Sequence, residues 1–425
     1  MTHSKNSEDS VLLEAITAIW REILNLDLIR PDDNFFDIGG DSISGLRLAN
    51  RIQKEIGENV LSVIVFDAPT VNDMVRYLQD NYPLAIRQRF KPTMVVIEND
   101  ALKQAEKTRQ VDPEKVRALE KTINEKYSHF GSINVSDKKN PRIVLVLSPP
   151  RSGSTLLRVM MAGNPKLFSP PELNLLPFSD FRESRRIAGD RLRALLEDGL
   201  IRSLMQIHRW GADEAKGYLD RLEQDGTTVK EIYRIIQKGI GDRMLVDKSP
   251  INSLYRDCLS RAEQYFDEPL YIHLSRHPYG MIKSYEESHL DLLFSYEDDC
   301  TTREMAEMVW ILSHRNLLGF LQDIPVNRQF RITYEDMVTH SESVMRDISR
   351  FLEIDFTDRM LTPYDGHSER MTDGILDEGE MIGDRKFLKQ KAISSKSAFA
   401  WKDHYKDDFL CDESRRLARE LGYQI

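Results

Sequence analysis

The stretch LVLSPPRSGSTLL, residues 145–157, joins an apolar run to a short glycine, serine and threonine turn that opens a helical pattern. Backbone N–H groups at the start of a helix carry partial positive charge, so such a turn can bind an anion. A magnesium-dependent nucleotide loop would read GxxxxGK[ST], with the lysine reaching the outer phosphates. Here Arg151 precedes the turn and that lysine is missing. The stretch therefore predicts a site for an anion other than magnesium-bound ATP.

After Pro141, short apolar runs alternate with longer helical patterns, which predicts an α/β domain with a parallel sheet flanked by helices. The predicted strands are RIVLVLS (142–148), RMLVDKS (243–249), PLYIHLSR (269–276) and RQFRITYED (328–336). Parallel sheets bind ligands at the carboxyl ends of their strands, where Arg151, Lys248 and Arg276 stand. Three cations at one edge of the sheet predict a polyanionic ligand.

The composition of the 425 residues is globular, with 40% apolar and 30% charged residues, and the length predicts two or three domains. No apolar run of membrane-spanning length and no leader pattern occurs, so we expect a cytoplasmic protein that does not bind membranes. The net charge of −10 argues against nucleic acid as the main partner. Cys258, Cys300 and Cys411 are scattered and odd in number, which predicts ordinary buried thiols and no metal site.

The first 80 residues form an acidic segment, with 14 Asp and Glu against 7 Lys and Arg. Residues 11–24 show apolar positions at helical spacing, and a second helix is expected to begin at Ser42. Gly39 and Gly40 allow a tight backbone before this helix, and Asp41 can cap it. Its apolar faces are supplied by Ile43, Leu46, Leu48 and Ile52. Ser42 then faces outward at the helix start, either as a second capping residue or as a site of modification.

DNFFDIGGDSISGLRLANRI (33–52) resembles the modification site of acyl and peptidyl carrier proteins of polyketide and nonribosomal peptide synthases, and VFDAPTVNDMVRYL (65–78) resembles their last helix. The resemblance implies a four-helix carrier domain over residues 1–82. It also implies that a separate phosphopantetheinyl transferase attaches 4′-phosphopantetheine to Ser42, and that upstream synthase modules are partners. A flexible arm raises the effective concentration of its acyl thioester at a nearby active site.

Residues 83–141 are charged and turn-rich at both ends, which predicts a linker that is partly helical, with one helix over 113–127. Two interpretations of this helix stay open at the level of sequence. It belongs either to the linker or to the larger core of the following domain.

PPRSGSTLL (149–157) resembles the 5′-phosphosulfate loop of sulfotransferases that use 3′-phosphoadenosine 5′-phosphosulfate (PAPS). RHPYGMIKS (276–284) resembles their 3′-phosphate motif, and RITYEDM (331–337) resembles a segment that follows in the family. The resemblance implies a PAPS-dependent sulfotransferase domain over residues 142–425. It implies that Arg276 and Ser284 bind the 3′-phosphate of PAPS. The residues expected to bind its 5′-phosphosulfate are Arg151, Ser152, Gly153, Ser154 and Thr155.

Sulfuryl transfer to an alcohol needs no Mg²⁺, because the transferred group carries less charge than a phosphoryl group. Arg151 and Lys248 are expected to assist the transfer, with Lys248 neutralising the bridging oxygen as it leaves. Alternatively, Lys248 is a solvated surface lysine.

In-line transfer also requires a base that takes the proton of the acceptor hydroxyl. The histidine that many cytosolic sulfotransferases carry after a Lys-Thr pair is absent from residues 247–250, which read DKSP. Glu172, in SPPELNLLPF (169–178), resembles the glutamate base of protein-tyrosine sulfotransferases and is our first choice. Arg202 is a candidate for orienting the acceptor. The alternative bases are His208, His273, His277 and His314.

A carrier fused to a sulfotransferase implies that the acceptor is an acyl chain on the carrier itself. The combination most resembles terminal-alkene-forming polyketide synthases, in which a β-hydroxyacyl thioester is sulfated so that sulfate can leave. A thioesterase follows in those synthases, and no such segment is assigned within these 425 residues. We therefore expect a downstream thioesterase or lyase as a separate partner, with the sulfate either kept or expelled.

Two other classes of protein stay open. The second domain could be a P-loop kinase or ATPase, in which Asp247 would be the acidic residue that holds Mg²⁺. The whole chain could also be a docking scaffold without catalytic activity. Dependence of nucleotide binding on the 3′-phosphate would separate the kinase from the sulfotransferase, and turnover would separate the scaffold.

Overall fold

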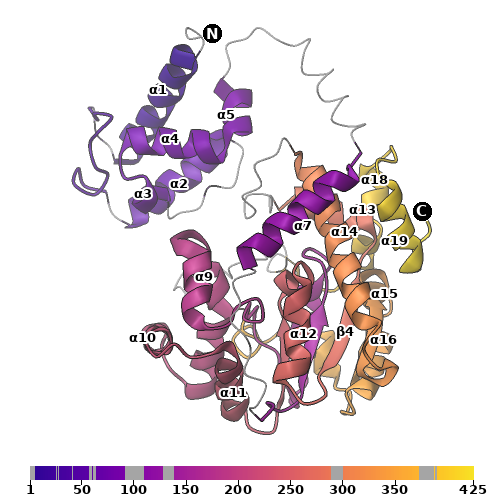
Figure 1. The fold of residues 1–425 in the computed structure, drawn as a ribbon. Helices are drawn as coiled ribbons and strands as arrows, with labels where there is room; N and C mark the ends of the chain where they lie inside the picture. The colour runs from indigo at the N-terminus through magenta and orange to yellow at the C-terminus, as the bar shows by residue number, and fades with distance from the viewer. Residues whose placement is uncertain are drawn as a thin grey trace. The chain divides into compact units, whose positions relative to one another are not determined.

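The computed structural model describes residues 5–24, 26, 28–40, 42–56, 60, 64–90, 110–127, 138–288, 300–372, 387 and 390–425. The chain divides into two compact units, Met1–Ala105 and Glu106–Ile425 (Figure 1). Each unit has a hydrophobic core of its own.

The first unit is helical, as predicted for a carrier domain. Its helices are α1 (Lys5–Leu24), α2 (Ser42–Ile56), α3 (Ile64–Asp67), α4 (Val71–Asn81) and α5 (Pro83–Phe90). Trp20 and Phe35 meet edge to face in its core, with ring centroids 5.0 Å apart. Ala85 and Ile86 of α5 are buried in the same core. The helical packing therefore continues beyond residue 82.

Helix α2 begins at Ser42, as the sequence predicts. Gly39 has φ +103°, and a Cβ atom on Gly40 would lie 2.3 Å from the ring of Phe35, so both positions favour glycine. Leu48 and Ile52 are buried on the inner side of the helix. Asp41 and three side chains lie outside the described residues, so their predicted roles stay predictions. These side chains belong to Ser42, Ile43 and Leu46.

The second unit contains a five-stranded parallel sheet in the order β2-β3-β1-β4-β5, which confirms the predicted α/β class. The strands are β1 (Ile143–Leu147), β2 (Leu167–Phe168), β3 (Met244–Lys248), β4 (Leu270–Ser275) and β5 (Gln329–Thr333). Four of them match predicted strands. The sequence missed β2, because a two-residue strand shows no hydrophobic period.

Helices cover both faces of this sheet (Figure 1). Successive side chains of a strand point to opposite faces, so β1 contributes Leu145 to one hydrophobic cluster and Val144 to the other. The helices are α8 (Ser154–Met161), α9 (Phe181–His208), α10 (Ala212–Gln224), α11 (Val229–Gly239), α12 (Arg256–Tyr265), α13 (Pro278–Glu286), α14 (Thr302–Leu321), α15 (Tyr334–Thr339), α16 (Ser341–Phe351), α18 (Trp401–His404) and α19 (Asp412–Glu420). The central strand β1 thus lies between two packed helical layers.

Helix α7 (Pro113–Tyr127) matches the helix predicted over 113–127. Its apolar side lies in the core of the second unit through Val116, Leu119 and Ile123. Lys115 pairs with Glu304 of α14 at 3.0 Å. Helix α7 therefore packs as part of the second unit. The domain boundaries at 82/83 and 141/142 stay predictions.

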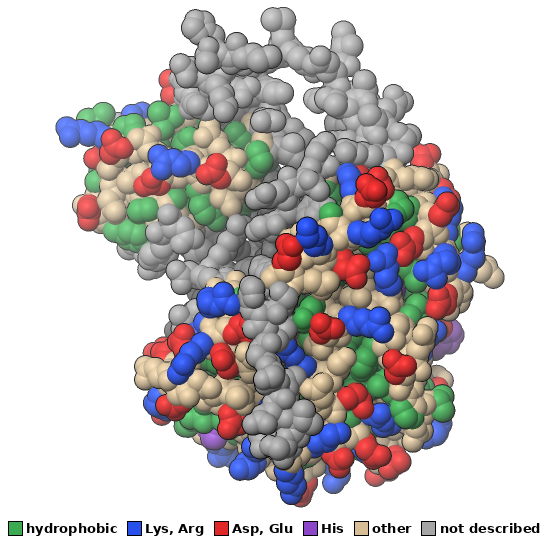
Figure 2. All heavy atoms as spheres, in the orientation of Figure 1, with side chains coloured by type: hydrophobic (Ala, Val, Ile, Leu, Met, Phe, Trp, Pro, Cys, Tyr) green, Lys and Arg blue, Asp and Glu red, His purple; other side chains and the backbone are tan. Residues whose placement is uncertain are grey.

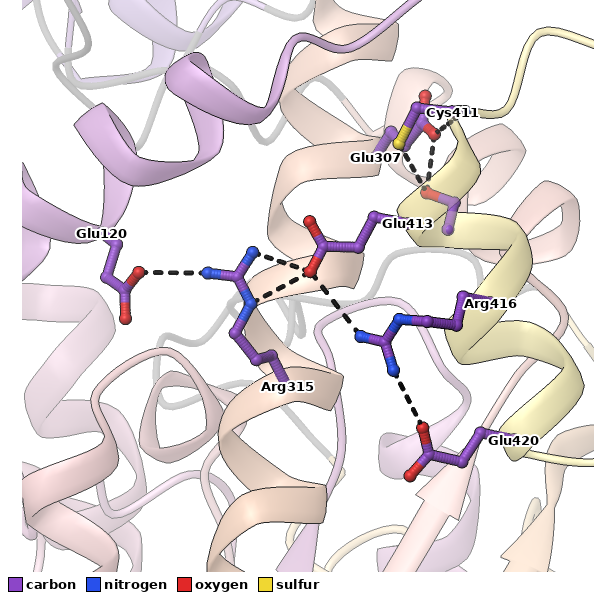
Figure 3. Close-up of polar contacts among 8 residues, drawn as sticks. Glu120, Glu307, Arg315, Cys411, Glu413, Arg416 and Glu420 are labelled. Carbon is purple, nitrogen blue, oxygen red and sulfur yellow. Dashed lines mark hydrogen bonds and ion pairs between the residues drawn. The ribbon is translucent and has the colours of Figure 1, made fainter.

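Polar contacts join α7, α14 and α19 (Figure 3). Arg315 of α14 lies between two carboxylates, 3.1 Å from Glu120 of α7 and 2.8 Å from Glu413 of α19. Buried Glu307 of α14 accepts a hydrogen bond from the backbone N–H of Cys411 at 2.8 Å, at the point where α19 begins. These contacts fix the C-terminal helix against the second unit.

Positive and negative side chains are interspersed on the described surface of the second unit that faces the viewer in Figure 2. Within the described ranges, no helix combines the length and the apolar character needed to cross a membrane. Cys258 and Cys411 are buried as predicted, whereas Cys300 is only half-buried.

A buried histidine pair makes the stability of the second unit sensitive to acid. His273 Nε2 lies 3.3 Å from His314 Nδ1 in the core. Burial lowers the pKa of His273 to about 3 and the pKa of His314 well below its usual value. The unfolded chain binds protons at these histidines below about pH 6.5, and the folded chain does not. Stability from the pair is therefore complete above that pH and is lost as the pH falls.

Between pH 6.5 and pH 5, we expect each of the two histidines to lower the free energy of unfolding by about 1.4 kcal/mol for each pH unit. Urea denaturation at several pH values measures this slope. A His273→Asn/His314→Asn variant should show a shallower slope than the wild type. An unchanged slope in that variant would refute the assignment.

Candidate active site

The loop between β1 and α8 turns sharply at two residues. Arg151 has φ +62° and Gly153, the N-cap of α8, has φ +86°. A Cβ atom on Gly153 would lie 2.3 Å from the ring of Tyr334, so this close approach requires glycine. Ser152 is fully buried, and its Oγ has no hydrogen-bond partner among the described residues. A helix N-terminus with an unsatisfied buried hydroxyl in the same loop fits an anionic group.

The segment that resembles a 3′-phosphate motif lies against this loop. Arg276 follows β4, and its Nη1 donates a hydrogen bond to the carbonyl oxygen of Arg151 at 2.9 Å. Its guanidinium carbon lies 4.1 Å from the ring centroid of Tyr334. Arg151 Nε in turn donates to Ser284 Oγ at 3.3 Å. The structure thus brings together both predicted anion-binding segments, which are 125 residues apart in sequence at Arg151 and Arg276.

Arg276 also has unused hydrogen-bonding capacity. Within the described part of the chain, its buried Nε has no hydrogen-bond partner. Burial lowers the pKa of its guanidinium, because the charged form loses solvation. Both properties fit a residue that binds an anion such as the 3′-phosphate of PAPS.

Lys248 and Glu172 form an ion pair beside the loop. Lys248 is the last residue of β3 and is 3% exposed, so it is no solvated surface lysine. Its Nζ also lies 3.5 Å from Thr155 Oγ1 at the start of α8. The Glu172 side chain is 37% exposed and is thus accessible to a second substrate. Lys248 therefore lies between the candidate base and the loop 148–153 with the start of α8, which we call the anion-binding loop after its predicted role.

Further charged groups surround Glu172. Arg202 Nε of α9 lies 3.3 Å from Asp198 Oδ1, and both side chains are buried. Burial raises the pKa of Asp198, while Arg202 and Arg158 oppose that shift. Burial likewise lowers the pKa of Arg158 to about 9, and the charges of Asp198 and Glu172 counteract this effect. The predicted role of Arg202 toward the acceptor stays a prediction, and the structure places it in this charged layer.

The described contacts of the four alternative bases differ from those of Glu172. His273 and His314 pair in the core, and His208 at the end of α9 stacks on Trp210 with centroids 4.2 Å apart. His277 stacks on Trp401 at 4.1 Å, and burial lowers its pKa to about 4. Among the described contacts of the five candidates, only those of Glu172 include Lys248. The geometry thus favours Glu172.

Sequence reasoning missed several residues around the anion-binding loop. Tyr334 packs against Gly153 and Arg276, whereas the resemblance of RITYEDM to the family implies no role for its tyrosine. A Cβ atom on Gly280 would lie 3.3 Å from Trp401 of α18. Tyr423 donates a hydrogen bond to Glu335 at 3.2 Å. No local sequence pattern predicts a place at the site for Trp401 or Tyr423, because only the folding of the C-terminal segment brings both residues there.

Asp247 does not fit the role of a magnesium ligand. Its Oδ2 accepts a hydrogen bond from Tyr233 at 2.5 Å, and its Oδ1 accepts one from Ser249 at 2.6 Å. Across the described residues, no group of three or more His, Cys, Asp or Glu side chains could hold a metal ion. The kinase or ATPase alternative therefore has no support from this site.

Comparison with known proteins agrees with this arrangement. A model of the sulfotransferase family matches residues 141–358, and a phosphopantetheine attachment site model matches residues 14–78. The sulfotransferase domain from the curacin biosynthetic pathway is 36% identical, with a TM-score of 0.62, and the match covers 68% of this chain and all of that domain. The sulfotransferase domain of the Synechococcus PCC 7002 olefin synthase is 33% identical, with a TM-score of 0.62, over 69% of this chain and all of that domain.

The carrier unit has relatives among large synthases. Surfactin synthase subunit 2 of Bacillus subtilis (strain 168) is 34% identical over 84 residues, which are 20% of this chain. That match spans only 2% of the length of the synthase subunit.

These matches confirm the predicted combination of a phosphopantetheine carrier domain with a PAPS-dependent sulfotransferase domain. The sulfotransferase model covers just over half of the chain, including the anion-binding loop, Glu172, Lys248 and Arg276. The chain therefore belongs to the sulfotransferase family.

Proposed function

We propose that the chain transfers the sulfuryl group of PAPS to a hydroxyl group, β to the thioester, of an acyl chain that 4′-phosphopantetheine holds on Ser42. The observation that carries this proposal is the position of Lys248 between Thr155 and the partly exposed carboxylate of Glu172. The anion-binding loop lies on one side of Lys248. On the other side lies Glu172, the proposed base, whose carboxylate an acceptor can reach. Such an arrangement suits proton removal and leaving-group stabilisation in one step.

The donor side of the site is formed by loop and strand-end residues. The first N–H groups of α8, together with Arg151, Ser152 and Thr155, are suited to the 5′-phosphosulfate. Arg276 and Ser284 are suited to the 3′-phosphate, which ordinary adenine nucleotides lack. PAPS supplies an activated sulfuryl group whose transfer releases adenosine 3′,5′-bisphosphate.

On the acceptor side, Glu172 takes the proton of the hydroxyl group as the new O–S bond forms. Lys248 stabilises the negative charge that develops on the bridging oxygen when the old S–O bond breaks. No metal ion takes part in this scheme.

The product would be a sulfated acyl thioester on the carrier. Sulfate is a far better leaving group than hydroxide, so the sulfated chain is activated for elimination or off-loading. The similar domains from the curacin pathway and the olefin synthase support this direction. In our proposal a downstream thioesterase or lyase acts next, and upstream synthase modules supply the hydroxyacyl chain.

Intact-protein mass spectrometry tests the proposal. The carrier of the full chain is loaded with candidate β-hydroxyacyl groups and incubated with and without PAPS. We expect a gain of about 80 Da, the mass of one sulfuryl group, only with PAPS. A β-deoxy acyl chain is the matched substrate control. If no hydroxyacyl chain gains this mass while adenosine 3′,5′-bisphosphate binds, the docking scaffold is the better interpretation.

The attachment site has a test of its own. Coenzyme A and a phosphopantetheinyl transferase should add about 340 Da to the wild-type chain, the mass of the arm. Ser42→Ala should gain nothing, because the hydroxyl group that accepts the arm is missing. Ser44→Ala, two residues later, is the matched control and should be modified normally. Modification of Ser42→Ala would show that the arm is attached elsewhere.

A further inference from the structure

Strand β3 ends in residues whose side chains point to different sides. Lys248 faces Thr155 and Glu172, as described above. Asp247 and Ser249, its two neighbours, hydrogen-bond to each other at 2.6 Å. Successive residues of an extended chain alternate in direction, so the same short segment serves the reaction site on one side and a buried polar cluster on the other.

The buried cluster leads to the loop that carries Glu172. Tyr233 of α11 donates to Asp247 Oδ2, and Ser249 donates to Asp247 Oδ1. Because its proton is directed to Asp247, Ser249 Oγ is free to act as an acceptor, and the backbone N–H of Asn174 donates to it at 2.9 Å. All four residues are at most 3% exposed. Fully buried hydrogen-bonded networks of this kind hold their members rigidly.

Asn174 stands two residues after Glu172 and has φ +50°, a left-handed conformation that asparagine adopts more readily than most other non-glycine residues. On the other side of this loop, α9 approaches the backbone of Glu172 so closely that a Cβ atom on Gly199 would lie 2.1 Å from the Glu172 carbonyl oxygen. The backbone around Glu172 is thus held from two sides, by the hydroxyl of Ser249 and by α9.

We propose that Ser249, oriented by Asp247 and Tyr233, is a positioning residue that sets the place of the Glu172 carboxylate relative to Lys248. It acts through the backbone of Asn174 and touches neither substrate. This inference rests on the proposed function, in which Glu172 is the base. Displacement of a reacting group by about 1 Å can cost roughly 100-fold in rate, so one buried hydroxyl is sufficient for a large effect.

The test compares two buried serines in the holo full-length chain. Ser249→Ala should lower single-turnover sulfation by about 10–100-fold and leave the affinity for adenosine 3′,5′-bisphosphate within about three-fold, because the anion-binding loop is untouched. Ser253→Ala is the matched control. Its hydroxyl is equally buried but donates to Pro250 O at 2.7 Å, away from the Glu172 loop. This control should transfer sulfate at nearly the wild-type rate.

Combination with Glu172→Gln distinguishes positioning from a general loss of structure. If Ser249 acts through Glu172, Ser249→Ala should slow Glu172→Gln little further, since effects of residues in one network are not additive. Ser249→Thr, which keeps the hydroxyl group, should recover most of the rate. Tyr233→Phe should lower the rate of sulfation less than Ser249→Ala does. Nucleotide affinity reports that each variant is folded.

Three results would overturn the inference, and they separate its failure from the failure of the proposed function. If Ser249→Ala transfers sulfate as fast as Ser253→Ala, or if its effect adds fully to that of Glu172→Gln, Ser249 does not position the base. The proposed function is untouched by that result. If Glu172→Gln alone transfers sulfate normally, the base assignment fails, and the inference fails with it.

Discussion

Glu172→Gln is expected to lower single-turnover sulfation of the acylated carrier by about 10²–10⁴-fold. Glutamine keeps the shape of the side chain but cannot take a proton from the acceptor hydroxyl. The affinity for adenosine 3′,5′-bisphosphate should change only a few-fold, because Lys248 lies between Glu172 and the loop predicted to bind the nucleotide. Rapid-quench measurement of sulfated carrier and calorimetry of nucleotide binding give the two quantities.

Two further variants control this prediction. Glu342→Gln changes an exposed glutamate of α16 that pairs with Arg346, and it should leave the rate unchanged. Lys248→Ala should slow transfer and also weaken binding of the product nucleotide, because the charge it neutralises persists on the product. If Glu172→Gln reacts at a near wild-type rate, the base is another residue. His208 and His277 would then be tested first.

Arg276→Ala is expected to weaken binding of adenosine 3′,5′-bisphosphate by about 2–4 kcal/mol, roughly 30–1,000-fold. Loss of one partner of a buried charged hydrogen bond has this scale. Binding of 5′-AMP should weaken much less. Some loss is expected even there, because Arg276 also holds the carbonyl of Arg151 in the anion-binding loop. Calorimetry with both nucleotides measures the difference.

Lys121→Ala, which removes an exposed cation of α7, is the control for net charge and should change neither affinity. If Arg276→Ala lowers the affinity for the two nucleotides equally, Arg276 supports the loop without contacting the 3′-phosphate. Ser284→Ala offers an independent check, since its hydroxyl accepts a hydrogen bond from Arg151 Nε. This variant should also lose more affinity for the bisphosphate than for 5′-AMP.

Several parts of the site follow from local sequence patterns. The anion-binding loop was predictable because Gly153 and the hydroxyl residues beside it join a strand to a helix within a few positions. The helix start at Ser42 was predictable because two glycines and Asp41 precede a run of apolar residues at helical spacing. Arg151, Lys248 and Arg276 could be placed at one edge because parallel strands end on the same side of a sheet. Each of these inferences needs only neighbours in the chain or the period of one element.

Other parts required the folded chain. The short strand β2 has no period to detect, and the placement of α7 in the second unit depends on partners such as Glu304 and Arg315, which lie about 190 residues away. Sequence left Lys248 open as a solvated surface residue. Its burial follows from the packing of α8 and the Glu172 loop over the end of β3.

By itself, the sequence determined the class of each unit, the anion-binding loop, and the candidate residues Ser42, Glu172, Lys248 and Arg276. Only the tertiary structure decided that Glu172 pairs with Lys248, 76 residues away, and that Tyr334 packs on Gly153. It alone revealed the path from Asp247 through Ser249 to Asn174. The physical reason is that local patterns report which elements form, whereas the meeting of side chains depends on how distant elements pack and which buried polar groups must satisfy one another.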